Sequence, residues 1–360
     1  MSARIGAVDA FLVVSFGGPE GPDDVVPFLE NVTRGRGIPR ERLVEVGAHY
    51  AHFGGVSPIN ALNRDLVQAI RSELAARGHD VPVLWGNRNW DPFLAGALAE
   101  ARDLGVTRVF SFLTSAYSSY SGCRQYRENL FDALSEVQSR SADPDPAASW
   151  APEVHKLRTY FNHPEFLAAM TDATRRSLAG LPEGSRLVFT THSIPMADAQ
   201  QCDYVAQHED VAATIADALG RGSDWDLVYQ SRSGSPHVPW LEPDIGDHLE
   251  ALAHSGAPGA VMVPIGFVSD HMEVVWDLDT VATDVARAVG LPVARAATAG
   301  TDPRFAAMAV DLFEESRALL AGQSVDRPAG GGLGPRVVAC APGCCPNPRG
   351  SRPALCGSDR

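Results

Sequence analysis

Two stretches of the sequence carry residues that could perform acid–base or metal chemistry, and the first is centred on His192. Residues 191–195 (Thr-His-Ser-Ile-Pro) directly follow the apolar stretch 187–189, which predicts a buried strand. Ligand sites in open α/β sheets lie at the carboxyl ends of strands, where His192 is expected. Histidine accepts protons near neutral pH and binds divalent metals, so His192 is a candidate base or metal ligand. The alternative is a histidine that only packs or donates a hydrogen bond in the core.

The second stretch is acidic and follows the apolar residues 261–265. If the segment from Asp270 onward is helical, Asp270, Glu273 and Asp277 recur at spacings of three and four residues and share one face. Such a row beside His271 could pass a hard divalent cation inward. The alternative is an acidic helix face in solvent. The apolar residues 274–276 between the acids indicate partial burial instead, and buried carboxylates require a reason.

The cysteines are unevenly distributed, because four of the six lie within the last 21 residues, at Cys340, Cys344, Cys345 and Cys356. In a cytosolic protein such clustering indicates metal binding rather than disulfides. Thiolate ligands favour zinc or an iron–sulfur cluster, and the spacing does not choose between them. The alternative is a tail of unliganded thiols.

Strands alternate with helices along the first half of the chain, which predicts a parallel sheet covered by helices. The strands are predicted at residues 10–16, 81–85 and 108–113, and the helices at 23–31, 63–77 and 92–104. Residues 139–152, rich in Ser, Ala, Pro and Asp, are predicted to be a loop between the two halves.

The alternation then restarts, which favours two similar α/β domains over one large sheet. The second half is predicted to contain strands at residues 186–190, 225–230 and 260–265 and helices at 164–178, 211–219, 244–253, 280–289 and 303–320. We therefore predict an N-terminal domain over residues 1–150, a C-terminal domain with a closing helix over 151–321, and a Gly-rich hinge with the cysteine tail over 322–360.

The composition is that of a folded globular protein, with 45% hydrophobic and 21% charged residues. The formal net charge of −14 argues against a nucleic-acid partner, because binding a polyanion requires a basic surface. The longest apolar stretches, such as residues 259–268, are shorter than the roughly 20 residues of a membrane span. We expect a cytoplasmic monomer without stable membrane insertion.

Six stretches resemble, in the same order, the signatures of the ferrochelatase family. They are residues 16–19 (Phe-Gly-Gly-Pro), 54–60 (Gly-Gly-Val-Ser-Pro-Ile-Asn), 191–195, 229–234 (Tyr-Gln-Ser-Arg-Ser-Gly), 239–244 (Pro-Trp-Leu-Glu-Pro-Asp) and 266–273 (Gly-Phe-Val-Ser-Asp-His-Met-Glu). The resemblance extends over about residues 10–320. It implies the chelatase fold, two Rossmann-like domains with a porphyrin cleft between them.

The resemblance also implies roles for individual residues. In that family the positions of His192 and Glu273 face the porphyrin centre, where Fe2+ enters as substrate and two pyrrole protons leave. Asp270 and Asp277 would continue an acidic path for metal or protons. The Asn31–Arg36 loop supplies guanidinium groups suited to propionates, and Phe16 replaces a tyrosine of some relatives. The expected porphyrin contacts are Phe16, Arg34, Arg36, Ser57, Tyr117, Arg124 and Tyr126.

Within that family, the arginine pair and the lack of an apolar membrane lip suit a polar, four-carboxylate substrate, so the sequence resembles the actinobacterial coproporphyrin type. Some ferrochelatases, including those of actinobacteria, carry a C-terminal [2Fe–2S] cluster, which the cysteine tail is similar to. The resemblance implies insertion of Fe2+ into coproporphyrin III in haem biosynthesis, with transient contact to the next enzyme of that pathway. It also implies that Cys123 or Cys202, inside the folded part, can replace one tail cysteine as a ligand. The alternatives are a protoporphyrin IX ferrochelatase, a cobalt or nickel chelatase, or a non-catalytic haem- or iron-sensing protein.

Overall fold

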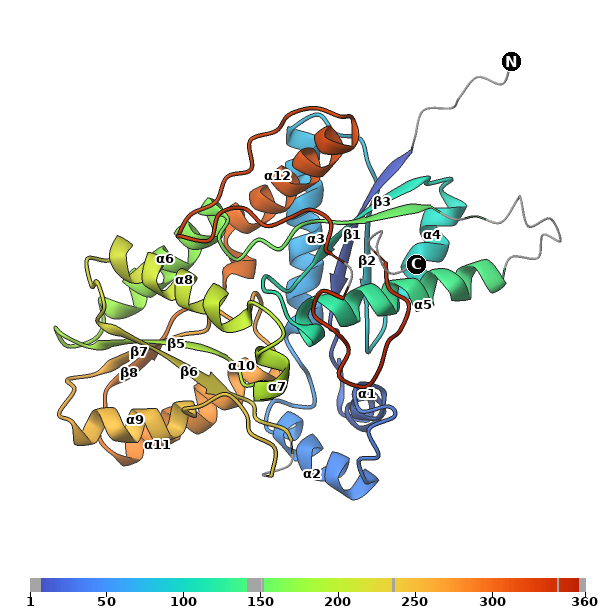
Figure 1. Cartoon of the computed structure of the whole chain (residues 1–360). Coiled ribbons are helices and arrows are strands. Elements are labelled where there is room, and N and C mark those ends of the chain that lie inside the picture. Colours follow the sequence, from blue (N-terminus) through green and yellow to red (C-terminus); the bar gives the residue numbers. More distant parts are fainter. Residues whose placement is uncertain (1–7, 141–149, 151, 235–236, 342, 356–360) are drawn as a thin grey trace, which may run out of the picture.

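The computed structural model describes residues 8–140, 150, 152–234, 237–341 and 343–355 (Figure 1). Within these residues two four-stranded parallel sheets lie side by side, each covered by helices, and an irregular tail follows the last helix. This arrangement confirms the predicted chelatase-type α/β fold. The predicted linker 139–152 and Cys356 lie largely or wholly outside the described residues.

The first sheet has the strand order β2-β1-β3-β4. Side chains of its central strand alternate between two faces: Phe11 and Val13 pack toward α3 and α12, while Leu12 and Val14 pack toward α4 and α5. A strand apolar on both faces is what a sheet covered on both sides requires. The strands are β1 (Asp9–Ser15), β2 (Val83–Asn87), β3 (Arg108–Leu113) and β4 (Glu153–Lys156).

The second sheet repeats this topology with the order β6-β5-β7-β8. Its strands are β5 (Arg186–His192), β6 (Trp225–Gln230), β7 (Ala260–Val263) and β8 (Val293–Arg295). From β5 the chain passes to one neighbour and then to the other, so the gap between the carboxyl ends of β5 and β7 is a topological switch point, where open α/β sheets bind ligands.

The helices of the first half are α1 (Val25–Val32), α2 (Arg40–Ala51), α3 (Ile59–Ala76), α4 (Leu94–Asp103) and α5 (Gln125–Ser139). Those that follow are α6 (Pro164–Leu178), α7 (Met196–Ala199), α8 (Tyr204–Ala218), α9 (Ile245–His254), α10 (Met272–Val275), α11 (Thr283–Ala288) and α12 (Pro303–Leu320). Short helical turns are η1 (Pro22–Asp24), η2 (Tyr120–Arg124), η4 (Asp277–Ala282) and η5 (Ala299–Thr301).

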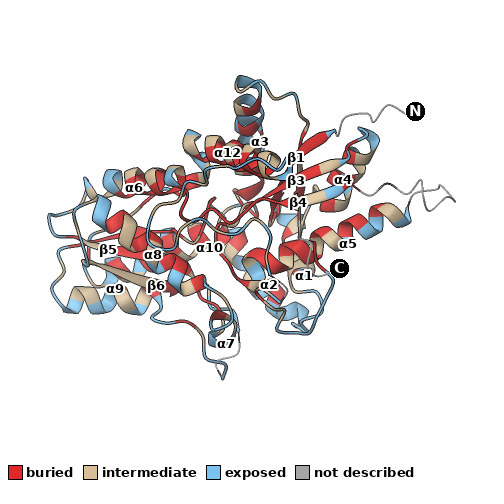
Figure 2. Cartoon of the chain, turned by 45° about the horizontal axis from the view of Figure 1, so that its top comes forward, coloured by how far each residue is buried: buried red, intermediate tan, exposed pale blue. Residues whose placement is uncertain are grey.

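Helix α12 connects the two halves, because it packs against α3 of the first and α6 of the second. Its carboxylates add ion pairs in both directions. Asp311 accepts from Arg77 at 2.6 Å, and Glu315 accepts from the buried Arg158 at 2.9 Å. Buried red segments run through both sheets and α12 in Figure 2. The closing helix thus fixes the two halves relative to one another.

The tail after α12 (red in Figure 1) runs back across the molecule and lies along α5 of the first half. Asn162 donates to the Gly334 carbonyl at 2.7 Å, and Arg352 pairs with Asp132 of α5 at 2.7 Å. Strand β4 follows the predicted boundary at residue 150 yet joins the first sheet by pairing with β3. The predicted domain boundaries at residues 150 and 321 stay a prediction. No helix among the described residues is both long and apolar enough to cross a membrane.

Candidate active site

His192 is the last residue of strand β5, beside the switch point of the second sheet. Its Nδ1 donates to the Ser193 carbonyl, which leaves Nε2 as the free acceptor of the neutral ring. The backbone below it is fixed by Tyr204 of α8, whose hydroxyl donates to the His192 carbonyl at 3.0 Å. The ring is therefore held in one orientation by groups of the surrounding fold.

A buried polar network supports this strand end from inside. The Thr191 hydroxyl lies 2.6 Å from the Tyr204 hydroxyl and 2.9 Å from Nε2 of His208. Burial lowers the pKa of His208 to about 3, so this second histidine is neutral and structural. Gly266 crosses directly over the same threonine, because a Cβ at Gly266 would lie 2.1 Å from Thr191 Oγ1. Only glycine lets the end of β7 approach this closely.

Glu273 lies opposite His192, with its Oε1 3.4 Å from the Nε2 of the histidine. It stands in the first turn of the short helix α10, whose N-terminus His271 caps through its ring nitrogen. Burial disfavours the carboxylate, but His192 and then His271 outweigh it and lower the pKa of Glu273 to about 2. Burial likewise opposes the charged imidazole, and Glu273 more than compensates, raising the pKa of His192. Each of these two partly exposed side chains therefore favours the charged form of the other.

Asp277 follows Glu273 along the same segment, at the start of the π-helical turn η4. Its carboxylate accepts from the hydroxyl of Ser231, a non-glycine residue with a φ of 62° at the end of β6. Burial, together with the charge of Glu273, raises the pKa of Asp277 to about 6 against the opposing hydrogen bond from Ser231. A carboxyl group of that pKa can exchange protons near neutral pH.

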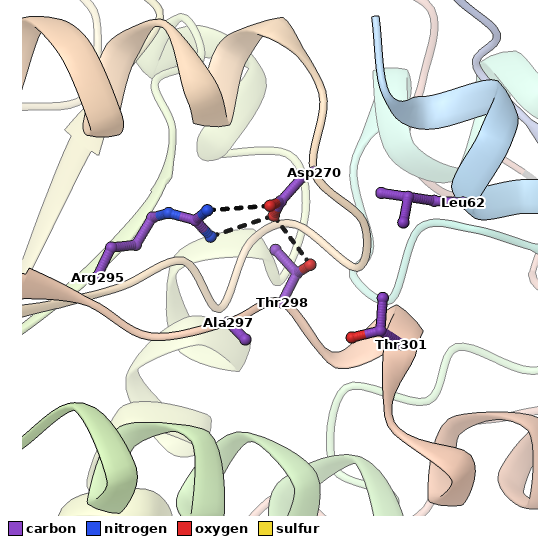
Figure 3. A pocket seen from close by; sticks show the side chains of 6 residues that line it. All are labelled: Leu62, Asp270, Arg295, Ala297, Thr298 and Thr301. Atoms are coloured by element: carbon purple, nitrogen blue, oxygen red, sulfur yellow. Dashed lines mark hydrogen bonds and ion pairs between the residues drawn. The ribbon is translucent and has the colours of Figure 1, made fainter.

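Asp270 does not join the other two acids, so the expected single acidic face is wrong for this residue. It precedes the helix and forms a two-pronged ion pair with Arg295, with the shortest contact at 3.0 Å, while Thr298 donates to it at 3.0 Å. Figure 3 shows this group lining a separate pocket with Leu62 and Thr301. Arg295 of β8 thus engages Asp270 in this pocket.

The first half faces this site with a cluster of aromatic and apolar side chains from α1, α2 and the loops after β1 and β2. Phe16 packs edge-on against Phe28 with ring centres 6.2 Å apart, and Trp276 of the second half stacks on His49 of α2 at 4.3 Å. Burial, and after it the charge of Glu273, raises the pKa of Tyr50 in this cluster. The carboxylate thus lies within electrostatic reach of the opposing wall.

The other expected porphyrin contacts separate into two groups. Arg34 and Arg36 are exposed, and Tyr126 lies under the guanidinium of Arg88 at 4.3 Å from the ring centre. Tyr126 is buried, and so are the other three residues. Ser57 packs beneath Gly18, Tyr117 stacks on His208 at 3.6 Å, and Arg124 donates to Glu128 and to the Arg352 carbonyl of the tail.

The cysteines converge on the start of α5. The thiol of Cys123 interacts with Cys340, Cys340 with Cys344, and the Sγ atoms of Cys344 and Cys345 are 3.7 Å apart. Cys202 instead donates to the Asp198 carbonyl at 3.3 Å. Within the described part of the chain, no three His, Cys, Asp or Glu side chains already surround a point suited to an ion.

Several residues of the site were missed by sequence reasoning. Gln230 donates to the backbone carbonyl of Glu273. Ser231 donates to the Asp277 carboxylate, and Tyr204 donates to the backbone carbonyl of His192. Gln230 and Ser231 lie in the stretch 229–234, so their position at the carboxyl end of a predicted strand was the available signal. Tyr204 and Arg88 have no comparable sequence pattern, because they reach the site from α8 and from the loop after β2.

Comparison with known proteins agrees with this geometry. The family model described as Ferrochelatase matches residues 8–317. A coproporphyrin III ferrochelatase of Streptomyces griseus subsp. griseus is 55% identical over 369 residues, covering 98% of this chain and 96% of its own. One of Mycolicibacterium vanbaalenii is 50% identical over 351 residues, covering 94% of this chain and 99% of its own.

Among solved structures, SirB from Bacillus subtilis with Fe3+ has a TM-score of 0.54 at 11% identity, covering 88% of this chain and 98% of that chain. At this identity the likeness concerns the fold alone. The family model and the full-length relatives confirm the resemblance drawn from the sequence motifs. With the family model spanning both sheets and the His192–Glu273 pair, the chain belongs to the ferrochelatase family.

Proposed function

We propose that this chain inserts Fe2+ into coproporphyrin III and releases two protons. The observation that carries the proposal is the His192–Glu273 pair, 3.4 Å apart at a topological switch point and facing an apolar aromatic wall. A flat apolar macrocycle requires such a wall, and its metallation requires a proton acceptor at the ring centre. The names of the relatives at 50–55% identity support the same substrate.

His192 is the proposed proton acceptor. Because Nδ1 is committed to the Ser193 carbonyl, Nε2 takes the pyrrole proton and then holds it against Glu273 Oε1. Each turnover must remove two protons while Fe2+ enters, so His192 has to lose the first proton before it accepts the second. The carboxylate of Glu273 stabilises the imidazolium and accepts its proton transiently.

Asp277 is the proposed next proton acceptor after Glu273. Its pKa of about 6 is far closer to neutrality than that of Glu273, so a proton passed along the segment rests on Asp277 before it leaves. Asp244 lies within electrostatic range of Asp277 and lines a pocket together with Ser193 and Asp247. This pocket gives the protons a polar route away from the ring centre.

The experiment that tests the function is anaerobic metal insertion, followed by the loss of free-porphyrin fluorescence. With Fe2+ and coproporphyrin III, we expect turnover at least tenfold faster, as kcat/KM, than with protoporphyrin IX. Faster turnover of protoporphyrin IX would show that protoporphyrin IX, and not coproporphyrin III, is the substrate. Tight binding of both porphyrins without any turnover would contradict the enzyme and favour the haem- or iron-sensing protein.

We further propose a resident [2Fe–2S] cluster held by Cys123, Cys340, Cys344 and Cys345. Two observations favour it: these thiols form a continuous chain of contacts, and the buried cations Lys156 and Arg127 act on Cys123 and Cys340. Thiolate sulfur suits an iron–sulfur cluster, and nearby cations offset its negative charge. When bound, the cluster supplies a structural or sensing centre, since metal insertion transfers no electron.

Replacing Cys123 with serine tests this ligand set. We expect Cys123→Ser to lose most of the cluster iron and acid-labile sulfide per chain, whereas Cys202→Ser retains both, because its thiol is bonded to the Asp198 carbonyl. Visible absorption and iron and sulfide content are the measurements. If Cys123→Ser kept the full iron and sulfide content and Cys356→Ser lost it, the fourth ligand would be Cys356 and not Cys123.

We propose that the enzyme works in the cytoplasm as a monomer and passes its product by transient contact to the next haem-pathway enzyme. A reducing compartment keeps a cluster of thiols available as metal ligands instead of disulfides, which supports this location.

A further inference from the structure

Three guanidinium groups from distant parts of the chain meet beside the turn η2. Arg88, which follows β2, donates to the Ser121 carbonyl at 3.4 Å. Arg349 of the cysteine tail donates to the hydroxyl of the adjacent Tyr120 at 3.2 Å. Partial burial, and after it the charges of Arg349 and Arg88, lower the pKa of Arg36, so its guanidinium lies within electrostatic range of both. We name Arg36, Arg88 and Arg349 the arginine triad.

The arginine triad is an electrostatic anomaly in an acidic protein. The chain has a formal net charge of −14, yet across the described ranges no ion pair joins any of the three arginines to a carboxylate. The nearby carboxylate of Glu128 accepts a hydrogen bond from the Tyr120 hydroxyl and does not pair with the three arginines. It already accepts hydrogen bonds from Arg124 and Asn347. Converging like charges repel one another, so the arrangement is favourable when an anion lies between them.

The position of the arginine triad relates it to the reacting centre. The guanidinium of Arg88 lies 5.6 Å from the ring centre of Phe16 and 4.3 Å from that of Tyr126. Burial raises the pKa of Tyr126 against the opposing charge of Arg88, and the charge of Glu273 adds to the rise, so Tyr126 lies within electrostatic range of Glu273. The arginines therefore stand at the margin of the surface on which the macrocycle would lie, where the carboxylates on its periphery would be.

We propose that Arg349, carried by the cysteine tail, joins Arg36 and Arg88 in binding a peripheral carboxylate of the porphyrin. This inference rests on the proposed function. It makes the tail part of the substrate site, in addition to its role as a holder of cysteines.

The contacts on either side of Arg349 show how the tail presents it. Asn347 donates to Glu128 at 3.1 Å, two residues before, and Arg352 pairs with Asp132 at 2.7 Å, three residues after. Both partners lie on α5, which begins directly at η2. The tail is thus fixed to the same helix that carries Tyr126 beneath Arg88.

Steady-state kinetics of Arg349→Ala test the proposal. We expect KM for coproporphyrin III to rise about tenfold with kcat within twofold, the loss of one charge-assisted hydrogen bond. Arg349→Lys should recover part of the affinity. The matched control is Arg336→Ala, another tail arginine, whose charge is already paired with Asp203 at 2.6 Å. Iron and sulfide content per chain must remain at the wild-type level, which separates a missing guanidinium from a lost cluster.

Porphyrin binding without Fe2+, measured by fluorescence quenching, separates this inference from the proposed function. If the wild type binds coproporphyrin III but never metallates it, the function fails, while a weaker Kd in Arg349→Ala still supports the carboxylate contact. If the wild type turns over and Arg349→Ala has the same KM and Kd, the inference is overturned and the function stands.

Discussion

Replacing His192 with alanine reduces iron insertion by about 10³-fold or more while leaving porphyrin binding within a factor of about three. The imidazole Nε2 is the proposed acceptor of pyrrole protons, and the side chain is 28% exposed, so its removal leaves the apolar wall intact. The support beneath it also remains, because Tyr204 binds the backbone carbonyl of residue 192. The measurement is anaerobic kcat with Fe2+ and coproporphyrin III, beside the Kd for coproporphyrin III from fluorescence quenching.

The control for this substitution is His254→Ala, which removes an exposed histidine whose ring nitrogen bonds within α9. Its activity should equal that of the wild type. Residual insertion above a tenth of the wild-type rate in His192→Ala would show that another group accepts the protons. Added imidazole that restores turnover would support the assignment, because it replaces the missing acceptor without altering the fold.

Glu273→Gln should lower the plateau of kcat/KM by about 100-fold and shift its acidic limb to lower pH. Glu273 raises the pKa of His192 against the opposing effect of burial, so removing the carboxylate lowers that pKa. His192 is then neutral, and able to accept a proton, over a wider range of pH. The plateau falls because the imidazolium has lost the group that stabilises it and takes its proton. The measurement is a pH profile of kcat/KM for both proteins.

Asp270→Asn provides the contrast for that profile. Because Asp270 is paired with Arg295 and lies in a separate pocket, its substitution should leave the acidic limb in place even if it lowers stability. An equal shift of the acidic limb in Asp270→Asn and Glu273→Gln would show that Asp270 also influences the pKa of His192. A limb that moves to higher pH in Glu273→Gln would show that Glu273 does not stabilise the charged form of His192.

Much of the fold could be predicted where apolar spacing coincided with strong terminal signals. Helix α12 has the predicted bounds, because Pro303 begins it and the Asp302 carboxylate accepts from the Arg304 amide at 3.0 Å. Other elements gave no such signal. Helix α2 buries only Leu43 and Tyr50, β4 has four residues with one buried, and β8 has three. Such polar or short elements are set by their neighbours and not by local pattern.

The centre of the site was predictable because both of its groups follow apolar strands. His192 and Glu273 meet at the carboxyl ends of β5 and β7 as parallel pairing requires. The surroundings depend on contacts between distant segments. Asp270 was assigned to a helix face, but α10 begins only at Met272. Tyr117 was expected among the porphyrin contacts, but it is buried in the core. The spacing of nearby residues predicts neither the start of α10 nor the packing of Tyr117 on His208.

The route of the tail sets an order of events during synthesis. Both sheets and α12 precede residues 340–349 in the chain and are synthesised first, and domains generally fold from the N-terminal end during synthesis. The first half thus folds with Cys123, Arg36 and Arg88 in place but without the partners that later come to lie on α5. A chain halted after α12 would keep His192 and Glu273 yet lack three of the four proposed cluster ligands and one member of the arginine triad. If Arg349 binds the porphyrin as proposed, the substrate site is complete only after translation has passed Arg349.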